Sequence, residues 1–535
     1  MDGQLRTIDL AVLIAYMASV FGLGCWFARK SGSTQEFMAA GRSLPGWAVG
    51  LSIFGTYVSS IGFLGNTGKA YGGNWNSWVF GLSLPFAAII AVRWFVPLYR
   101  KTDAISAYAQ LETRFGPWAR VYAMSLYLLS QLARIGSILY LVSLALAPLT
   151  GWDMTTIVLI TGVMVTVYTL IGGIEAVIWT DVVQSVVLVG GAILCAVVML
   201  MEIPGGSTQL FEIANANEKF SLGTFSVAPE TFTAAAPSFW MVLIYGIFIN
   251  LKNFGVDQSF VQRYVTAKSD QDAKNSVWLG TLLFPIVSTL FFFIGTGLFS
   301  LYQASPELRE EVRLQAAVDQ LKNEGAEPVE SAVAERAATL TDADFADKVL
   351  PHFIVNKLPV GVAGLLIAAI FAAAMSSIDT SLNSSATLVL CDIYERYVNP
   401  QTTERQSMTV LYGATLVFGV VGTSVAVILA AYNIKSALDV WWILEGIFSG
   451  GMLGLFLLGV LSRRAGNPQA ILAGVTGLMI IAWMVLSTQD FWPAEWADWS
   501  NPLHTFMTIV VGTTSIVLLG MLAGLFTTGN RQPVE

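Results

Sequence analysis

The stretch Ala373-Ala-Met-Ser-Ser-Ile-Asp-Thr-Ser-Leu-Asn-Ser-Ser385 places a cluster of polar side chains inside an apolar segment, 360–392, that is long enough to span a membrane. In a helix, four of them lie at i, i+3, i+4 and i+7 and share one face: Ser376, Asp379, Thr380 and Asn383. Because unpaired hydroxyl and carboxylate groups are costly at bilayer depth, this face must contact other helices, water or a bound ion. Oxygen ligands with one carboxylate suit a small alkali or alkaline-earth cation.

The composition around this segment is that of an integral membrane protein. Of the 535 residues, 55% are apolar and 12% are charged, whereas soluble domains carry about 25% charged residues. The three cysteines and two histidines show no metal-ligand spacing. The net charge of −8 comes without a basic stripe, which argues against a nucleic-acid partner.

Runs of apolar residues predict an all-helical membrane protein with about 13 spans. Their expected positions are near residues 9–27, 45–66, 76–99, 119–148, 153–171, 176–203, 238–256, 276–303, 359–391, 408–432, 438–463, 467–487 and 505–527. The first run lacks a basic front and a clear cleavage site, so we interpret it as a span rather than a signal peptide. The Ala- and Glu-rich loop 304–358 is expected to form short helices outside the membrane.

The distribution of basic residues predicts how the chain is oriented. With the N-terminus outside the cell, sixteen Lys and Arg residues of the short loops and the tail fall on the inner side and four fall on the outer side. This distribution satisfies the positive-inside rule. We therefore expect a multi-pass protein of a cell membrane, most simply the bacterial inner membrane, with its C-terminus in the cytoplasm.

The second predicted span, 46–65, is interrupted by three glycines and carries Thr56, Ser59 and Ser60. Such a span is typical of a broken helix whose free carbonyls coordinate a cation, although small residues also permit close helix packing. The seventh span shows a similar mixture of glycines and polar residues between Tyr245 and Asp257. Because five spans separate the two starts, a second unit built like the first must be inverted in the membrane.

Besides Asp379, two charged residues inside predicted spans are candidates for a functional role, because a charge there is costly unless it is paired. Asp181 lies about one and a half turns into the sixth span, and it either belongs to a functional site or reaches water at the interface. Arg134 lies in the middle of the fourth span, where its guanidinium pairs either with a protein carboxylate or with the carboxylate of a bound solute. Because no nucleotide-binding motif is visible, an ion gradient is the expected driving force.

Three segments together resemble the sodium:solute symporter family, which includes sodium-coupled sugar, sialic acid, proline and pantothenate carriers. They are Gly172–Gln184, Phe254–Arg263 and Ala373–Thr380, and the resemblance extends from about residue 8 to residue 464. It implies a leucine-transporter-like core of two inverted five-helix repeats with the solute near the middle of the membrane. The repeats are expected at 45–204 and 235–464, between a peripheral helix at 1–30 and two peripheral helices with a short tail at 467–535.

The resemblance also implies where sodium, the expected coupling ion, binds. The site shared by the family falls on the carbonyls of Gly55, Val58 and Ala373 and the hydroxyls of Ser376 and Ser377. A second site known in some members falls on Asp181 and Thr380, with Ser376 or Ser377. Asp379 stands where those members have a hydroxyl ligand, so Asp379 either joins this site or pairs elsewhere, and one or two sodium ions per cycle remain open.

The solute contacts implied by the resemblance are Ser59, Gly62, Arg134, Asn250 and Asn253. The chain departs from the galactose-transporting pattern at Gly62 and Gly81, which replace polar contacts, and at Asn253, which replaces an aromatic gate; Asn250 alone matches it. Arg134 resembles the arginine by which the family's sialic acid transporters hold the carboxylate, and Ser59 matches a neighbouring contact. The resemblance thus implies a symporter, not an enzyme, that imports an acidic sugar such as sialic acid, with a neutral sugar or another organic solute as the alternative.

Three other classes of protein are alternatives to a sodium-coupled symporter. A proton-coupled carrier fits Asp181 and Asp379 and predicts uptake that rises at acid pH without sodium. A channel needs a continuous pore, against which the two broken helices argue, and a transport-like sensor needs a signalling domain for which the tail is too short. We expect the protein to work as a monomer in the lipid bilayer, with sodium and a small solute as its partners.

Overall fold

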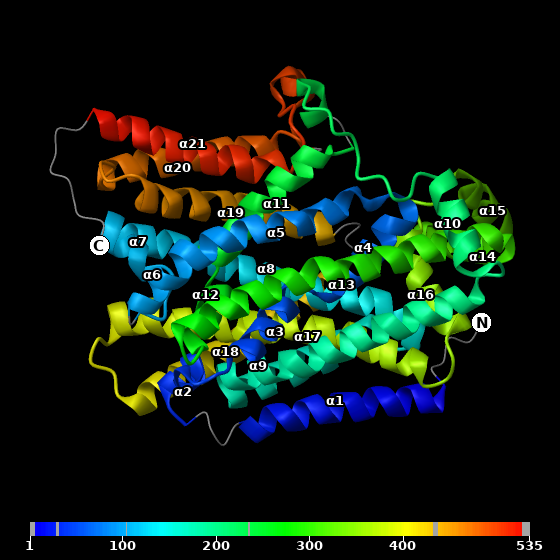
Figure 1. Ribbon diagram of the computed structural model, residues 1–535, viewed down its shortest axis with the longest axis horizontal. Coiled ribbons are helices and arrows are strands. Elements are labelled where there is room, and N and C mark those ends of the chain that lie inside the picture. Colours follow the sequence, from blue (N-terminus) through cyan, green and yellow to red (C-terminus); the bar gives the residue numbers. More distant parts are fainter. Residues whose placement is uncertain are drawn as a thin grey trace.

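The computed structural model describes residues 6–27, 32–102, 104–233, 236–431, 437–489 and 491–526. Within these ranges the chain is helical, and most helices run along the long axis of the molecule (Figure 1). The α-helices are α1 (Thr7–Phe27), α2 (Thr34–Ala39), α3 (Gly46–Tyr57), α4 (Ser60–Gly72), α5 (Val79–Ile90), α6 (Val96–Lys101), α7 (Ala109–Phe115), α8 (Pro117–Thr150), α9 (Met154–Glu202), α10 (Gly206–Ala216), α11 (Phe239–Val256), α12 (Gln258–Thr266), α13 (Asp270–Ala304), α14 (Pro306–Asn323), α15 (Glu330–Thr339), α16 (Ala346–Lys357), α17 (Val362–Leu388), α18 (Glu404–Ala431), α19 (Ala437–Leu461), α20 (Asn467–Leu486) and α21 (Met507–Leu525). The π-helical segment η5 (Val389–Val398) extends α17.

Ten of the described helices are long and apolar enough to span a membrane, and the bent pair α3–α4 makes eleven. The all-helical membrane fold expected from the sequence is therefore confirmed, whereas the count of 13 spans stays a prediction. One difference arises at α9, which joins the spans predicted near 153–171 and 176–203. Its 49 residues correspond to about 74 Å of helix, more than twice the ~30 Å of a bilayer core.

Gly173 divides α9 into two helical stretches. Its φ of +58° and ψ of −159° form a conformation that only glycine adopts readily. A Cβ atom at this position would lie 2.9 Å from both the Cα atom and the carbonyl oxygen of Phe37 in α2. The break therefore falls where the sequence predicts one span to end and the next to begin.

Two helices are broken inside the molecule. Tyr57 ends α3 and Ser60 begins α4, with a bend of 51° across the break, and the Ser59 hydroxyl accepts a hydrogen bond from the N–H of Gly62. Asp257 joins α11 to α12 through an extended backbone (φ −76°, ψ 117°). Both breaks lie in the segments in which the sequence predicted them, and helix ends of this kind leave backbone groups available to ligands.

Helix α17 forms the centre of the bundle. Of the most apolar 18 residues in this span, 89% are buried, against 28% for α1 at the edge. α17 packs against α9, α8 and α1, and α9 in turn packs against α3. The helix that carries the polar cluster is thus surrounded by other helices and not by lipid.

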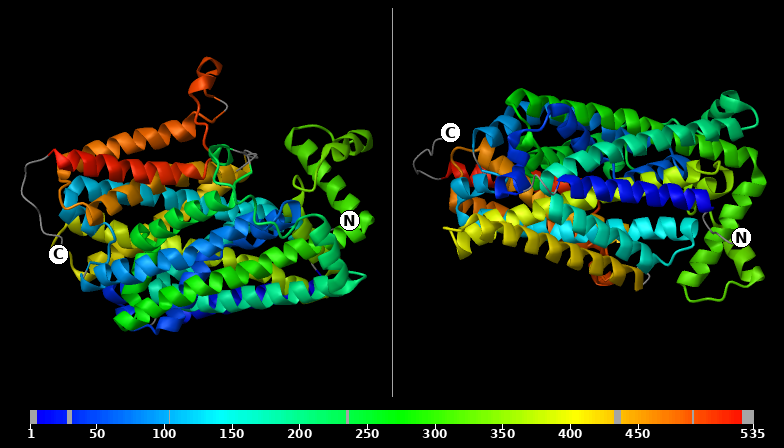
Figure 2. Two further views of the ribbon diagram at one scale, coloured as in Figure 1. Left: turned by 45° about the horizontal axis from the view of Figure 1, so that its top comes forward. Right: turned by 90° about the horizontal axis from the view of Figure 1, so that it is seen from below.

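Shorter helices gather at one end of the long axis. α10, α14, α15 and α16 lie at the end from which α1 starts, and α21 finishes at the opposite end (Figures 1 and 2). Helices α14, α15 and α16 occupy the loop 304–358, in which the sequence predicted short helices. The C-terminal helices α20 and α21 pack against each other and against α19.

Candidate functional site

The polar face of α17 is buried against neighbouring helices. Ser376, Asp379, Thr380 and Asn383 are each at most 2% exposed. The side-chain oxygen of Asn383 accepts a hydrogen bond of 2.8 Å from Gln262 in α12, and the Thr380 hydroxyl donates to the carbonyl of Ser376 at 2.7 Å. The expectation that this face avoids lipid is confirmed.

A buried ion pair lies beside this face. Nη2 of Arg263 in α12 is 2.9 Å from Oδ2 of Asp181 in α9, and it donates to the Thr380 hydroxyl at 2.6 Å. Nε of Arg263 donates to the Ser52 hydroxyl in α3 at 2.8 Å, and that hydroxyl donates to Asp181. Because Asp181 is fully buried, the interpretation in which it reaches water is wrong. Arg263 instead connects α3, α9, α12 and α17.

Arg263 was not among the site residues predicted from the sequence, although it ends one of the three family-like segments. Its position in the chain gives no sign of Asp181, which is 82 residues away. One signal was available, because an arginine that follows a broken span directly needs a counter-ion when the fold buries it. Asp181 and Asp379 were the two predicted intramembrane carboxylates that had no assigned protein partner.

Asp379 has a partner of its own on the same face. Its Oδ2 accepts a hydrogen bond of 2.6 Å from the Tyr168 hydroxyl in α9. In the described ranges, Oδ1 of Asp379, Oδ1 of Asp181 and the Ser376 hydroxyl are buried without a hydrogen-bond partner. Buried oxygens without a partner, two of them on carboxyl groups, suit a small cation.

The break in α3 lies against α9 and α17. A Cβ atom added to Gly55 would lie 3.1 Å from the hydroxyl oxygens of both Ser185 and Ser376, and 3.7 Å from the Cβ atom of Asp181. No bulkier residue fits there without displacing these side chains. Gly55 therefore permits the close approach that brings the α3 backbone to the polar face of α17.

The other residues of the first predicted sodium site lie on the same two segments. Val58 ends α3 with a non-helical backbone (φ −91°, ψ 83°). Ala373 and Ser377 are one turn apart in α17, and the Ser377 hydroxyl lies 3.4 Å from the Ala373 carbonyl oxygen, which makes a weak hydrogen bond. The predicted ligand oxygens therefore belong to two elements that face each other, the broken helix α3 and α17.

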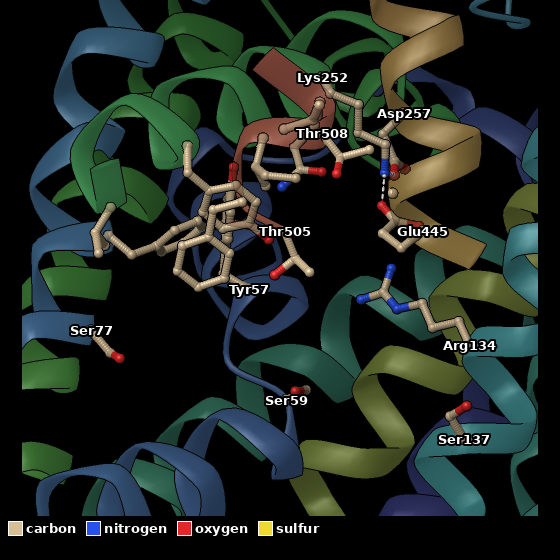
Figure 3. Close-up of a pocket in the computed structure, with 18 of the residues that line it drawn as sticks. Tyr57, Ser59, Ser77, Arg134, Ser137, Lys252, Asp257, Glu445, Thr505 and Thr508 are labelled. Atoms are coloured by element: carbon tan, nitrogen blue, oxygen red, sulfur yellow. Dashed lines mark hydrogen bonds and ion pairs between the residues drawn. The ribbon is translucent and has the colours of Figure 1, made fainter. Parts of the chain in front are cut away.

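A cavity of about 670 Å³ lies among the broken helices, α8, α13 and the C-terminal helices. Figure 3 shows part of its lining, with the side chain of Arg134 pointing into the cavity from α8. Of the predicted solute contacts, Ser59, Arg134 and Asn253 line this cavity. Gly62 and Asn250 do not belong to the lining; the Asn250 side chain is buried and donates a hydrogen bond of 2.8 Å into α5.

Arg134 makes few contacts for a guanidinium in this position. Its hydrogen bond from Nη2 to the carbonyl of Thr56, beside the break in α3, is long at 3.4 Å. Among the residues that the structure describes, no carboxylate lies within 4.0 Å of Arg134. The sequence left two partners open for Arg134, a protein carboxylate or the carboxylate of a solute. No carboxylate in the described part of the chain forms an ion pair with it.

A group of ion-paired residues forms another part of the cavity lining. Nζ of Lys252 in α11 lies 2.7 Å from Oε1 of Glu445 in α19 and 3.2 Å from Oδ2 of Asp257 at the second break (Figure 3). None of these three residues was among the predicted site residues. Lys252 appeared in the sequence only as one of several polar residues near the second break.

The C-terminal helices also line the cavity, although they were predicted from the sequence to be peripheral. Thr508 of α21 and Met484 of α20 contribute to the lining. Phe506, just before α21, stacks on Tyr245 of α11 with ring centroids 4.3 Å apart. One wall of the cavity is therefore built by segments outside the two predicted repeats.

Two broken helices, unpartnered buried oxygens between them and an adjoining cavity define a secondary transporter. The chain belongs to the sodium:solute symporter family, whose sequence profile matches residues 37–477. It is accordingly a sodium-coupled symporter for a small organic solute, and not an enzyme.

Several relatives are similar over nearly their whole length. The chain is 32% identical to the sodium/sialic acid symporter NanT of Aliivibrio fischeri, over 96% of this chain and 92% of that protein. It is also 32% identical to the sodium/sialic acid symporter SiaT of Proteus mirabilis, over 99% and 97%. A solved structure of a Na⁺-coupled sialic acid symporter in a substrate-bound, outward-open state matches 98% of this chain with a TM-score of 0.83 and 29% identity, and the match covers 100% of that chain.

Proposed function

We propose that this symporter imports an acidic sugar, with sialic acid as the first candidate. The observation that carries the proposal is the position of Arg134, whose guanidinium points into the cavity without an ion pair among the described residues. Because an unpaired guanidinium is costly at this depth, a solute carboxylate that forms two parallel hydrogen bonds with it offsets that cost. The relatives named as sodium/sialic acid symporters support the same solute.

We propose that sodium binds where the broken helix α3 faces α17. The carbonyls of Gly55, Val58 and Ala373 with the hydroxyls of Ser376 and Ser377 form the first site in this proposal. Asp181, Asp379 and Thr380 form a second site. The unpartnered oxygens of Ser376, Asp181 and Asp379 support a cation here.

In this proposal, sodium and the solute both stabilise the same conformation of the transporter. Sodium holds α3 against α17 and so stabilises the form that binds the solute, and by linkage the solute raises the affinity for sodium by the same factor. Movement of the core helices exposes both ligands to the cytoplasm, where the low sodium concentration favours their release. A membrane potential of ~100 mV contributes about 2.3 kcal/mol per charge, so even one sodium ion drives useful accumulation.

The wider organisation in this proposal follows the two broken helices. Residues 45–204 form the first inverted repeat and 235–464 the second, with α3–α4 and α11–α12 at their starts. The N-terminus lies outside the cell and the C-terminus in the cytoplasm, and the unit of transport is a monomer. The start of α1 and the end of α21 lie at opposite ends of the long axis, which supports termini on opposite sides of the membrane, and the distribution of basic residues supports the N-terminus outside.

The proposal is tested by uptake of labelled sialic acid into proteoliposomes that contain the purified protein. An inward sodium gradient is expected to drive accumulation, and an equal potassium gradient is not. Galactose is measured in parallel. Sodium-driven uptake of galactose without uptake of sialic acid would contradict the proposed solute, and uptake driven by a proton gradient in the absence of sodium would contradict the coupling ion.

The proposed first sodium site makes a separate prediction. Ser376→Ala removes a buried, unpartnered hydroxyl next to Gly55, so the sodium concentration for half-maximal uptake is expected to rise about tenfold, the equivalent of ~1.4 kcal/mol of lost binding. The matched control is Ser381→Ala on the same helix, whose hydroxyl is already bonded to the Ser377 carbonyl at 2.9 Å. An unchanged sodium dependence in Ser376→Ala would rule out this hydroxyl as a ligand.

A further inference from the structure

Four charged side chains gather on one side of the cavity: Arg134, Lys252, Asp257 and Glu445 (Figure 3). They come from α8, from α11, from the break between α11 and α12, and from α19. Their charges sum to zero, two positive and two negative. Arg134 lies close enough to Asp257 for the two charges to interact, yet it forms an ion pair with neither acid within 4.0 Å.

Lys252 occupies both acids at once. Its Nζ is 2.7 Å from Oε1 of Glu445 and 3.2 Å from Oδ2 of Asp257, and Lys252 is only 3% exposed. Each carboxylate also accepts a hydrogen bond from another donor. Oε1 of Glu445 accepts from the Ser449 hydroxyl at 2.7 Å, and Oδ1 of Asp257 accepts from the N–H of Ser259 at 3.0 Å. Both carboxylates are therefore ion-paired with Lys252 and not with Arg134.

From this arrangement we propose that Lys252 is a positioning residue that keeps Arg134 available to the solute carboxylate. This inference rests on the proposed function of Arg134 as the carboxylate-binding group. Lys252 holds Glu445 and Asp257, so neither acid draws the guanidinium away from the cavity. Its role is to set specificity for an acidic solute without touching that solute.

The physical reason lies in the low dielectric of the site. A charge buried beside an apolar wall interacts with its neighbours far more strongly than in water. Without Lys252, the Glu445 carboxylate on the cavity wall would lack a counter-ion. The long, flexible side chain of Arg134 lines the same cavity without an ion pair among the described residues and would supply one. An ion pair between Arg134 and Glu445 would prevent the guanidinium from binding the solute carboxylate. The solute carboxylate would then face an uncompensated negative charge in the cavity wall.

The test compares three variants in sodium-driven sialic acid uptake: Lys252→Met, Glu445→Gln and the two combined. Lys252→Met is expected to raise KM for sialic acid about tenfold or more, with the half-maximal sodium concentration unchanged. Glu445→Gln is expected to lower KM, because it removes a negative charge from the cavity. The combined variant should recover most of the affinity lost in Lys252→Met, since the acid that captures Arg134 is gone.

The pattern of KM values separates this role from a structural one. A merely structural Lys252 would lower the maximal rate and the yield of folded protein while KM for sialic acid stays unchanged, whether or not Glu445→Gln restores the yield. A rise in KM in Glu445→Gln alone would overturn the proposal, because Glu445 would then contact the solute directly. Lys348→Met, which breaks a Lys–Asp pair in the outlying helices α14–α16, is the matched control for loss of a lysine.

A thermal unfolding cycle tests the charges without any solute. Arg134→Gln and Glu445→Gln are expected to have additive effects on Tm in the parent protein, and non-additive effects when Lys252→Met is also present. Additivity in both backgrounds would overturn the inference. If the parent protein carries another acidic solute instead of sialic acid, the choice of solute fails while this cycle still reports on Lys252.

Discussion

Replacing Arg134 by alanine is expected to lower kcat/KM for sodium-driven sialic acid uptake by roughly 30-fold to several thousand-fold. Truncating one partner of a buried, hydrogen-bonded charge pair costs about 2–5 kcal/mol, and each 1.4 kcal/mol is about tenfold. Arg134 lines the cavity and has no ion pair among the described residues, so its loss removes the guanidinium that we propose holds the solute carboxylate. The measurement is initial uptake into proteoliposomes at saturating sodium.

Arg134→Lys tests the geometry of this interaction. Lysine keeps the charge but loses the planar fork that forms two parallel hydrogen bonds, so an intermediate loss of kcat/KM is expected. Arg336→Ala, which removes a partly exposed arginine of α15, is the matched control and should leave uptake unchanged. Normal uptake of sialic acid by Arg134→Ala would return Arg134 to a structural role.

Replacing Arg263 by methionine is expected to destabilise the protein by about 3–5 kcal/mol, because it leaves the Asp181 carboxylate buried without its cation. The same change removes the donors to the Ser52 hydroxyl in α3, the Thr380 hydroxyl in α17 and the Ser259 carbonyl in α12. Thermal unfolding of the purified protein in detergent measures the effect as a fall in Tm. The fall should persist at saturating sodium.

The double variant Arg263→Met with Asp181→Leu shows whether the unpaired charge is the cause. Removing both charges is expected to recover much of the lost stability, since apolar residues of similar volume often replace a buried pair at little cost. Arg336→Met breaks a partly exposed pair with Glu324 and should cost at most about 1 kcal/mol. A similar fall in Tm for Arg263→Met and Arg336→Met would contradict the importance of the buried pair.

Much of the fold could be predicted from the sequence because the relevant patterns are local. The polar face of α17 follows from residues three, four and seven positions apart, which a helix places side by side whatever surrounds it. The two broken helices follow from glycine and polar residues within single apolar segments. The number of spans was harder to predict, because the turn within α9 depends on one conformation of Gly173 and on its contact with Phe37.

The candidate site could be predicted only in part. Chain spacing and family resemblance selected Arg134, Asp181 and the α17 face, whose residues are fixed by their own helices. They did not give the partners, because Asp181 and Arg263 are 82 positions apart and Lys252 and Glu445 are 193 positions apart. The family resemblance also implied Gly62 and Asn250 as solute contacts, and neither lines the cavity.

By itself, the sequence determined that this protein is a helical membrane protein with a buried polar face, two broken helices and an intramembrane arginine. Those features depend on hydropathy and on helix geometry, which act within one segment. The tertiary structure alone decided that Arg263 pairs with Asp181, that Lys252 pairs with both Glu445 and Asp257, and that Arg134 has no ion pair among the described residues. Which charges pair depends on distances of a few Å between different helices, and packing sets those distances.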